Sequence, residues 1–309
     1  PARRGRAVAA GNSGGSCKPR GAQPMTGKGP MAGTGVVAML DVLGARNLDE
    51  TGSSSLLSAM DELLDEMESG WEQTKLKNPR PEQAHLPSPG AALFGDTVVY
   101  YWDSQPLLGY LTSQRGDDMQ GSPGNIEHVS IWLSAFLAMG YLRPIIYEGL
   151  ERGLPLRGIV AYGSYVVDAQ KKRNVVIGPA VADAAAWYEK PDWIGISTCP
   201  SLTVTLRRNY ALLRAMEAGM PFAMYYDVPL VDGRVFPSYC LGWPLEYANE
   251  EENTSYDITP RVGIDRFWKQ VHSRNLVRPG TETKYLNTER FVAAFFEHNA
   301  GFLRYFGIA

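Results

Sequence analysis

Two aspartates at the ends of short apolar runs are the residues whose type and position are best suited to chemistry. Asp41 follows the apolar run 36–40, and Asp96 follows Gly95 inside the apolar run 91–100. Runs of this length bounded by glycine are typical of buried strands. A carboxylate at the end of a buried strand is costly unless something compensates its charge. Two such carboxylates on neighbouring strands therefore indicate a divalent cation between them, because Mg²⁺ and Mn²⁺ favour carboxylate and phosphate oxygens.

Each aspartate taken alone has a simpler interpretation. Asp41 could cap a turn, and Gly95-Asp96 could be an ordinary hairpin corner. Asp96, however, stands within an apolar run and not in a polar loop. The turn alone therefore accounts less well for Asp96 than a paired, charge-compensated site does.

The composition limits the classes of function. The 309 residues allow one large domain or two modest ones, with 44% hydrophobic and 20% charged residues. A net charge of −3 argues against nucleic-acid binding by the whole surface. The three cysteines are far apart and form no metal-binding pattern, so we expect a protein of the reducing cytoplasm without zinc. No run of 18 uninterrupted apolar residues occurs, and we expect no membrane span.

The elements expected from periodicity and turn residues alternate between strands and helices. We expect strands at 35–42, 91–95, 97–102, 156–167 and 193–197, a hairpin in 222–238, and helices at about 51–71, 125–151, 180–188, 201–218, 261–274 and 288–304. The segments 77–90 and 103–124 read as loops. This order predicts an α+β fold built on a ferredoxin-type βαββαβ sheet with flanking helices and a C-terminal extension. The Asp96 carboxylate is expected at the tip of the hairpin formed by the second and third strands.

Four short motifs, in order along the chain, resemble those of the class III nucleotidyl cyclases. They are Leu40–Gly44, Phe94–Asp96, Arg157–Gly163 and Gly178–Ala185. The resemblance covers about residues 35–240 and implies the same βαββαβ sheet. Residues 1–34 are basic and rich in Gly, Ser and Pro, so we expect a disordered tail there. The rest of the chain is expected to divide into a cyclase catalytic domain at 35–245 and a C-terminal helical extension at 246–309.

Four positions depart from the pattern of the purine cyclases. Ala182 and Ala186 stand where those enzymes carry the Asn and Arg that steady the transition state, and Ala92 and Val175 stand near the residues that read adenine. A site without those polar groups should not select adenine strongly. The chain is most similar to the pyrimidine cyclases of the bacterial anti-phage Pycsar system, which implies conversion of UTP to 3′,5′-cyclic UMP as a defence signal. Cyclisation of CTP, an adenylate or guanylate cyclase, and a non-catalytic nucleotide-binding domain remain the alternatives.

The resemblance also implies roles for the first metal motif. Asp41 and Asp96 would bridge two Mn²⁺ or Mg²⁺ ions, with the Val42 carbonyl as a further ligand. The amides of the turn 43–45 (Leu43, Gly44 and Ala45) would hold the β- and γ-phosphates. Arg46 is a candidate phosphate clamp, because a guanidinium can grip two oxygens; the alternative is a surface arginine beside neighbouring acids.

The remaining candidates concern the middle of the chain and its partners. Arg157 stands on an apolar strand and needs a partner, which could be the triphosphate or a structural acid. The candidates for the base pocket are apolar or aromatic side chains, namely Met39, Phe94, Tyr162 and Tyr165. A single set of metal motifs implies a head-to-tail homodimer with nucleoside triphosphate sites at its interface.

Overall fold

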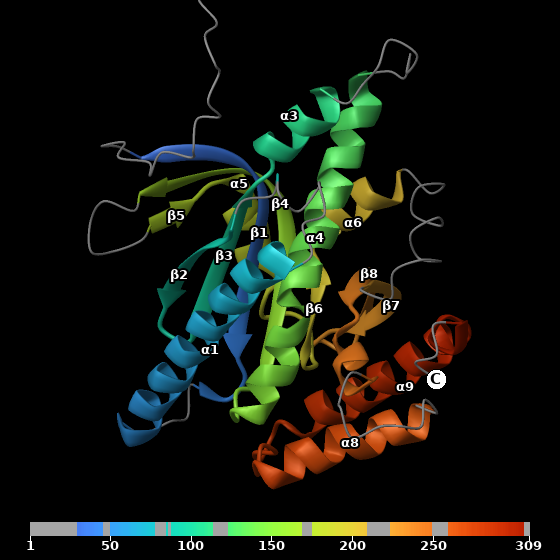
Figure 1. Cartoon of the computed structure of the whole chain (residues 1–309). Helices are drawn as coiled ribbons and strands as arrows, with labels where there is room; N and C mark the ends of the chain where they lie inside the picture. Colours follow the sequence, from blue (N-terminus) through green and yellow to red (C-terminus); the bar gives the residue numbers. More distant parts are fainter. Residues whose placement is uncertain are drawn as a thin grey trace, which may run out of the picture.

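The computed structural model describes residues 30–45, 50–77, 85, 88–113, 123–168, 175–208, 223–248 and 259–305. They form a mixed eight-stranded sheet with helices on both faces, which confirms the α+β class (Figure 1). The strands are β1 (Met31–Val42), β2 (Gly90–Phe94), β3 (Thr97–Asp103), β4 (Leu156–Asp168), β5 (Val175–Ile177), β6 (Gly195–Thr198), β7 (Ala223–Pro229) and β8 (Val235–Leu241). The helices are α1 (Glu50–Lys77), α3 (Gln105–Ser113), α4 (Pro123–Glu151), α5 (Pro179–Trp187), α6 (Pro200–Arg207), η2 (Trp243–Ala248), α8 (Pro260–Ser273) and α9 (Glu282–Tyr305).

The first half of the sheet has the predicted ferredoxin-type arrangement. The strand order is β2-β3-β1-β4-β6-β8-β7, with β5 attached to β4. β1 runs antiparallel to both β3 and β4, so the βαββαβ unit places the first strand at the centre. The central position explains why Val36–Leu40 are buried and apolar on both faces.

Several boundaries differ from the sequence prediction. β1 begins at Met31 and not at residue 35, because the long strand β4 pairs with it as far as Val167. The segment 103–124 was predicted to be a loop, but α3 occupies part of it and buries Leu107. α9 begins at Glu282, six positions before the predicted start at residue 288. The rest of the predicted tail, residues 1–29, and the end of the helix predicted at 201–218 lie outside the described residues.

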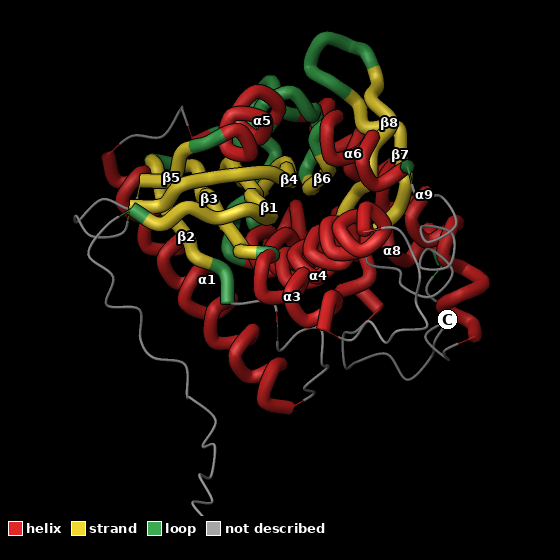
Figure 2. The backbone as a smooth tube through the Cα atoms, turned by 90° about the horizontal axis from the view of Figure 1, so that it is seen from above, coloured by secondary structure: helices red, strands yellow, loops and turns green. Residues whose placement is uncertain are grey.

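The two faces of the sheet are covered by different helices. α1 and α4 lie against one face and α5 lies on the other (Figure 2). On the α4 face, the rings of Tyr100 and Trp102 from β3 pack edge-on against Tyr141. On the α5 face, β4 carries Gly163, where an added Cβ would lie 3.5 Å from the Cβ of Ala180. Side chains alternate along a strand, so these contacts assign every residue of β1 and β4 to a face.

The long helix α4 is the only described one that is long and apolar enough to cross a membrane. Within its segment Ile126–Glu151, the most apolar 18-residue window has a mean hydropathy of 1.5 and is 67% buried inside the protein. Burial of this extent is typical of a core helix. The segment therefore packs as part of the domain core.

The C-terminal helices α8 and α9 pack beside the second half of the sheet (Figure 1). The indole ring of Trp193, which precedes β6, lies 4.6 Å from the ring of Phe291 on α9. The ring of Tyr226 on β7 packs against the same phenylalanine. These buried aromatics join α9 to the sheet.

Candidate functional site

Strand pairing brings the two aspartates to one edge of the sheet. Asp41 is the penultimate residue of β1 and stands between Thr97 of β3 and Arg157 of β4. Asp96 lies at the tip of the β2–β3 hairpin, as predicted, and its carbonyl oxygen accepts a hydrogen bond from Val42 N at 3.2 Å. The hairpin tip and the end of β1 are therefore joined directly.

The surroundings of Asp41 determine its charge. The residue is only 7% exposed. Burial raises the pKa of its carboxyl above the ordinary value, the Arg157 guanidinium acts in the opposite direction, and the negative charges of Asp96 and Glu189 raise it further. Asp96 is therefore close enough to act on Asp41 electrostatically. A cation bound near both carboxylates would relieve this repulsion.

Arg157 is the partner of Asp41. Its Nη2 and Nε donate to Asp41 Oδ2 at 3.0 and 3.3 Å. Its Nη1 donates to the carbonyls of Glu189 at 2.8 Å and Pro191 at 3.3 Å. The sequence left open a triphosphate or a structural acid as the partner of this arginine, and the structure provides an acid. The guanidinium leaves the second carboxylate oxygen of Asp41 without a bond to Arg157.

The turn after β1 holds the predicted phosphate-binding amides. Leu43 N donates to the Pro155 carbonyl at 2.9 Å, so this amide already has an acceptor, and its role as a phosphate ligand stays a prediction. Gly44 has φ of +82°, a conformation that favours glycine. Ala45 is the last residue described before a gap, and the candidate clamp Arg46 lies outside the described residues.

The candidate base-pocket residues do not form one cluster. Met39 shares the α5 face of β1 with Asp41 and is 8% exposed. Phe94 pairs with Thr97 at the hairpin and is 47% exposed. Among these candidate side chains, it is the one near the aspartates that solvent can reach. Tyr162 pairs with Val36, and strand alternation points it to the opposite face from Asp41.

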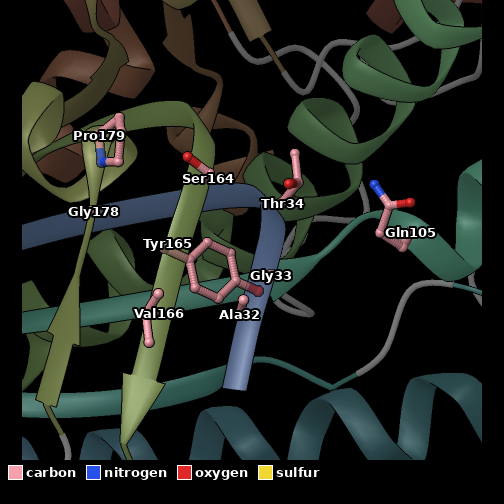
Figure 3. A pocket seen from close by; sticks show the side chains of 9 residues that line it. All are labelled: Ala32, Gly33, Thr34, Gln105, Ser164, Tyr165, Val166, Gly178 and Pro179. Carbon is pink, nitrogen blue, oxygen red and sulfur yellow. The ribbon is translucent and has the colours of Figure 1, made fainter. Parts of the chain in front are cut away.

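Tyr165 instead lines a cavity of about 280 Å³ at the start of β1 (Figure 3). Its ring lies against Gly33, where an added Cβ would come within 2.7 Å of a ring atom. Gly178 and Pro179, at the start of α5, close another side of the cavity. Gly33 and Asp41 are eight residue steps apart, about 26 Å along an ideal extended strand. The cavity and the aspartates therefore lie at opposite ends of β1.

The carboxylates fit a divalent cation that has further oxygen ligands. The described residues contain no group of three or more His, Cys, Asp or Glu side chains arranged for a metal. Mg²⁺ is commonly held by one or two carboxylates together with waters and substrate phosphates. Asp41 and Asp96 match that pattern in number and ligand type, so Mg²⁺ or Mn²⁺ would be held by both together with a bound triphosphate.

Sequence reasoning missed two residues, one that acts on Asp41 and one that contacts the turn after it. Glu189 contributes a negative charge that acts on Asp41, and it follows α5 in a stretch with no motif. Arg278 lies between α8 and α9, and its Nη1 donates to the Gly44 carbonyl at 2.8 Å. Neither residue is near the aspartates in sequence, so only the folded chain shows the proximity.

Comparisons with known proteins returned no matching family model and no matching curated protein. Among solved structures, the adenylyl cyclase CyaB from P. aeruginosa matches 69% of this chain and 96% of its own at 13% identity and a TM-score of 0.36. The catalytic core of a rhodopsin-guanylyl cyclase with converted specificity matches 69% and 98% at 10% identity, with a TM-score of 0.38. The guanylyl cyclase Cya2 matches 69% and 93% at 11% identity, with a TM-score of 0.32. Similarity at this level assigns neither a family nor an activity to this chain.

Proposed function

We propose that this chain is a pyrimidine nucleotide cyclase that converts UTP to 3′,5′-cyclic UMP and pyrophosphate. The observation that carries the proposal is the meeting of Asp41 and Asp96, from separate strands, at one edge of the sheet. Two carboxylates that repel each other suit a site that is completed by cations and a triphosphate. The four motifs that resemble those of class III cyclases lead to the same activity.

The chain's own residues bind and orient the reactants. Asp41 and Asp96 would hold the ions, with the Val42 carbonyl as the proposed further ligand. Arg157 donates two hydrogen bonds to Asp41 Oδ2 and so fixes the orientation of the other carboxylate oxygen. When bound, two Mg²⁺ or Mn²⁺ ions lower the pKa of the ribose 3′-hydroxyl and neutralise phosphate charge. The 3′-hydroxyl gives its proton to water, and the bond from the 3′-oxygen to the α-phosphorus forms. The bond from the α-phosphorus to the oxygen that bridges to the β-phosphate breaks, and pyrophosphate leaves.

The residues that stand in place of the polar groups of purine cyclases support the preference for a pyrimidine. Ala182 and Ala186 lie exposed on α5, and Ala92 is buried within β2, so none offers a side-chain hydrogen bond to a base. Val175 on β5 is 41% exposed and equally apolar. The choice of UTP over CTP rests on the resemblance alone, as do the anti-phage role and the cytoplasmic location.

We also propose a head-to-tail homodimer, which the resemblance to class III cyclases implies. The Tyr165 cavity and Asp41 lie at opposite ends of β1. A second copy in antiparallel orientation would bring its cavity to the first copy's carboxylates. The homodimer therefore forms part of the proposal.

The test of the proposal is incubation of the full chain with ATP, GTP, CTP and UTP separately in the presence of Mn²⁺. We expect cyclic UMP from UTP and loss of product in Asp96→Asn, while Asp61→Asn on the exposed face of α1 retains the activity. A cyclic AMP product without any pyrimidine product would refute the pyrimidine assignment. Full activity of Asp96→Asn would refute the carboxylate site.

The second candidate is a nucleotide-binding domain without turnover. The exposed alanines at 182 and 186, which cannot stabilise a transition state through hydrogen bonds, favour it. Calorimetry with UTP and Mn²⁺, with products followed in parallel, separates the two. Binding of UTP without formation of cyclic UMP would support the nucleotide-binding domain that has no catalytic activity.

A further inference from the structure

The connection between α8 and α9 returns to the turn that follows Asp41. Arg278, in that connection, donates from Nη1 to the Gly44 carbonyl at 2.8 Å, across 234 positions of sequence. An added Cβ at Gly44 would lie 3.3 Å from Arg278 Cδ. The arginine stem therefore lies directly against the turn, and its guanidinium lies beside the Gly44 carbonyl, three positions after Asp41.

The backbone of Arg278 is held in a fixed turn. Its amide donates to Thr281 Oγ1 at 3.1 Å, and Thr281 returns two hydrogen bonds to the Arg278 carbonyl, from Oγ1 at 2.7 Å and from N at 3.0 Å. On α9, burial raises the pKa of Tyr285 to about 12, and the positive charge of Arg278 opposes that rise. The side chain is thus presented from a rigid base and not from a loose loop.

Arg278 uses a smaller share of its hydrogen-bond donors than Arg157 and Lys284 do. Arg157 has a carboxylate and two carbonyls as acceptors. Lys284 is paired with Asp192 at 2.6 Å. Arg278, by contrast, donates to one backbone carbonyl and has no acidic partner among the residues that the structure describes. A guanidinium has five N–H donors, so several remain for an anion.

We propose that Arg278 binds the terminal phosphates of the nucleotide held at Asp41 and Asp96. The inference rests on the proposed function, and it adds a phosphate-binding residue from the C-terminal helices. Only three residues of chain, at most about 10 Å, separate Asp41 from Gly44. A triphosphate whose α-phosphate lies at the aspartates can therefore reach the guanidinium. An arginine fork matches two phosphate oxygens in geometry and in charge.

The test measures binding without turnover. Isothermal calorimetry with Mn²⁺ compares the four 3′-deoxynucleoside 5′-triphosphates, which lack the attacking hydroxyl, with their monophosphates. For the triphosphate that binds the wild-type protein best, we expect Arg278→Gln to weaken binding about ten-fold or more, the usual effect of losing a hydrogen bond to a charged group. Affinity for the corresponding monophosphate should change less than about two-fold, because the monophosphate lacks the terminal phosphates.

Two further variants separate phosphate binding from support of the turn. Arg274→Gln removes the same charge from the same connection, at a side chain that is 50% exposed, and should bind triphosphate as the wild type does. Arg278→Lys keeps the charge without the fork, so it should recover part of the affinity. It also serves as the test variant if Arg278→Gln does not fold.

The outcomes distinguish this inference from the proposed function. If the wild type binds a triphosphate but the Arg278 variants bind it unchanged, or lose triphosphate and monophosphate equally, the inference is overturned and the proposed function stands. If the wild type binds none of the four triphosphates, the proposed function fails and the inference fails with it. Selective loss of triphosphate affinity, partly recovered by lysine, supports the inference.

Discussion

Replacement of Asp41 by alanine should unfold the protein more easily as well as stop its chemistry. The side chains of Asp41 and Arg157 are each 10% exposed and are joined at 3.0 Å. The substitution leaves the Arg157 guanidinium buried without its carboxylate. Removing one partner of a buried ion pair costs about 3–5 kcal/mol, because an uncompensated charge remains.

The remaining contacts of Arg157 place the expected loss near the lower end of that range. Its Nη1 keeps the carbonyls of Glu189 and Pro191, which soften the loss of the carboxylate. Burial already disfavours the ionised form of Asp41, so its removal relieves part of that penalty. We therefore expect Asp41→Ala to reduce the free energy of unfolding by about 3 kcal/mol.

The assay is urea-induced unfolding followed by tryptophan fluorescence, with Asp96→Ala and the double variant Asp41→Ala/Arg157→Met alongside. Asp96 has no side-chain hydrogen bond or ion pair among the described residues, so its loss should change stability by about 0.5 kcal/mol or less. The double variant removes both buried charges and should recover at least about 2 kcal/mol of the single variant's loss. Equal unfolding midpoints for the two single variants, or a double variant less stable than Asp41→Ala, would refute the buried-pair argument.

Two further predictions concern packing and thiol chemistry. Gly35→Ala should lower the free energy of unfolding by about 1–3 kcal/mol, because its Cβ would lie 1.9 Å from the Trp102 carbonyl oxygen; an unchanged thermal midpoint would contradict this. Burial raises the pKa of the Cys199 and Cys240 thiols, so at pH 8 little thiolate exists. In a Cys17→Ser background both should react with Ellman's reagent only after unfolding, and rapid labelling of the folded protein would show that burial does not protect them.

The sheet was predictable because its signals are local. Apolar runs bounded by glycine marked β1 and the β2–β3 hairpin, and residue spacing marked α1 and α4. The start of β1 at Met31 was not predictable, because it depends on pairing with Val167, more than a hundred positions away. α3 was missed because its short apolar pattern follows polar residues and is stabilised by burial of Leu107.

The aspartate pair was predictable from the chain, but its surroundings were not. Each aspartate stands beside a local strand or turn signal, so its place at a strand end or hairpin tip followed from the sequence. The partner of Arg157 depends on the register between β1 and β4, which no local pattern specifies. The contact of Arg278 with Gly44 depends on how the C-terminal helices pack, so sequence reasoning could not find it.

The bond between Arg278 and Gly44 has a consequence for biosynthesis. The two residues are separated by 234 positions, so the ribosome adds Gly44 long before it adds the arginine that contacts it. At about 5–20 residues per second, the delay is on the order of 10–50 s. During that interval the nascent chain can pair β1, β3 and β4 while the turn after β1 lacks its contact from the C-terminal helices. A translational pause before residue 278 would prolong this half-finished state.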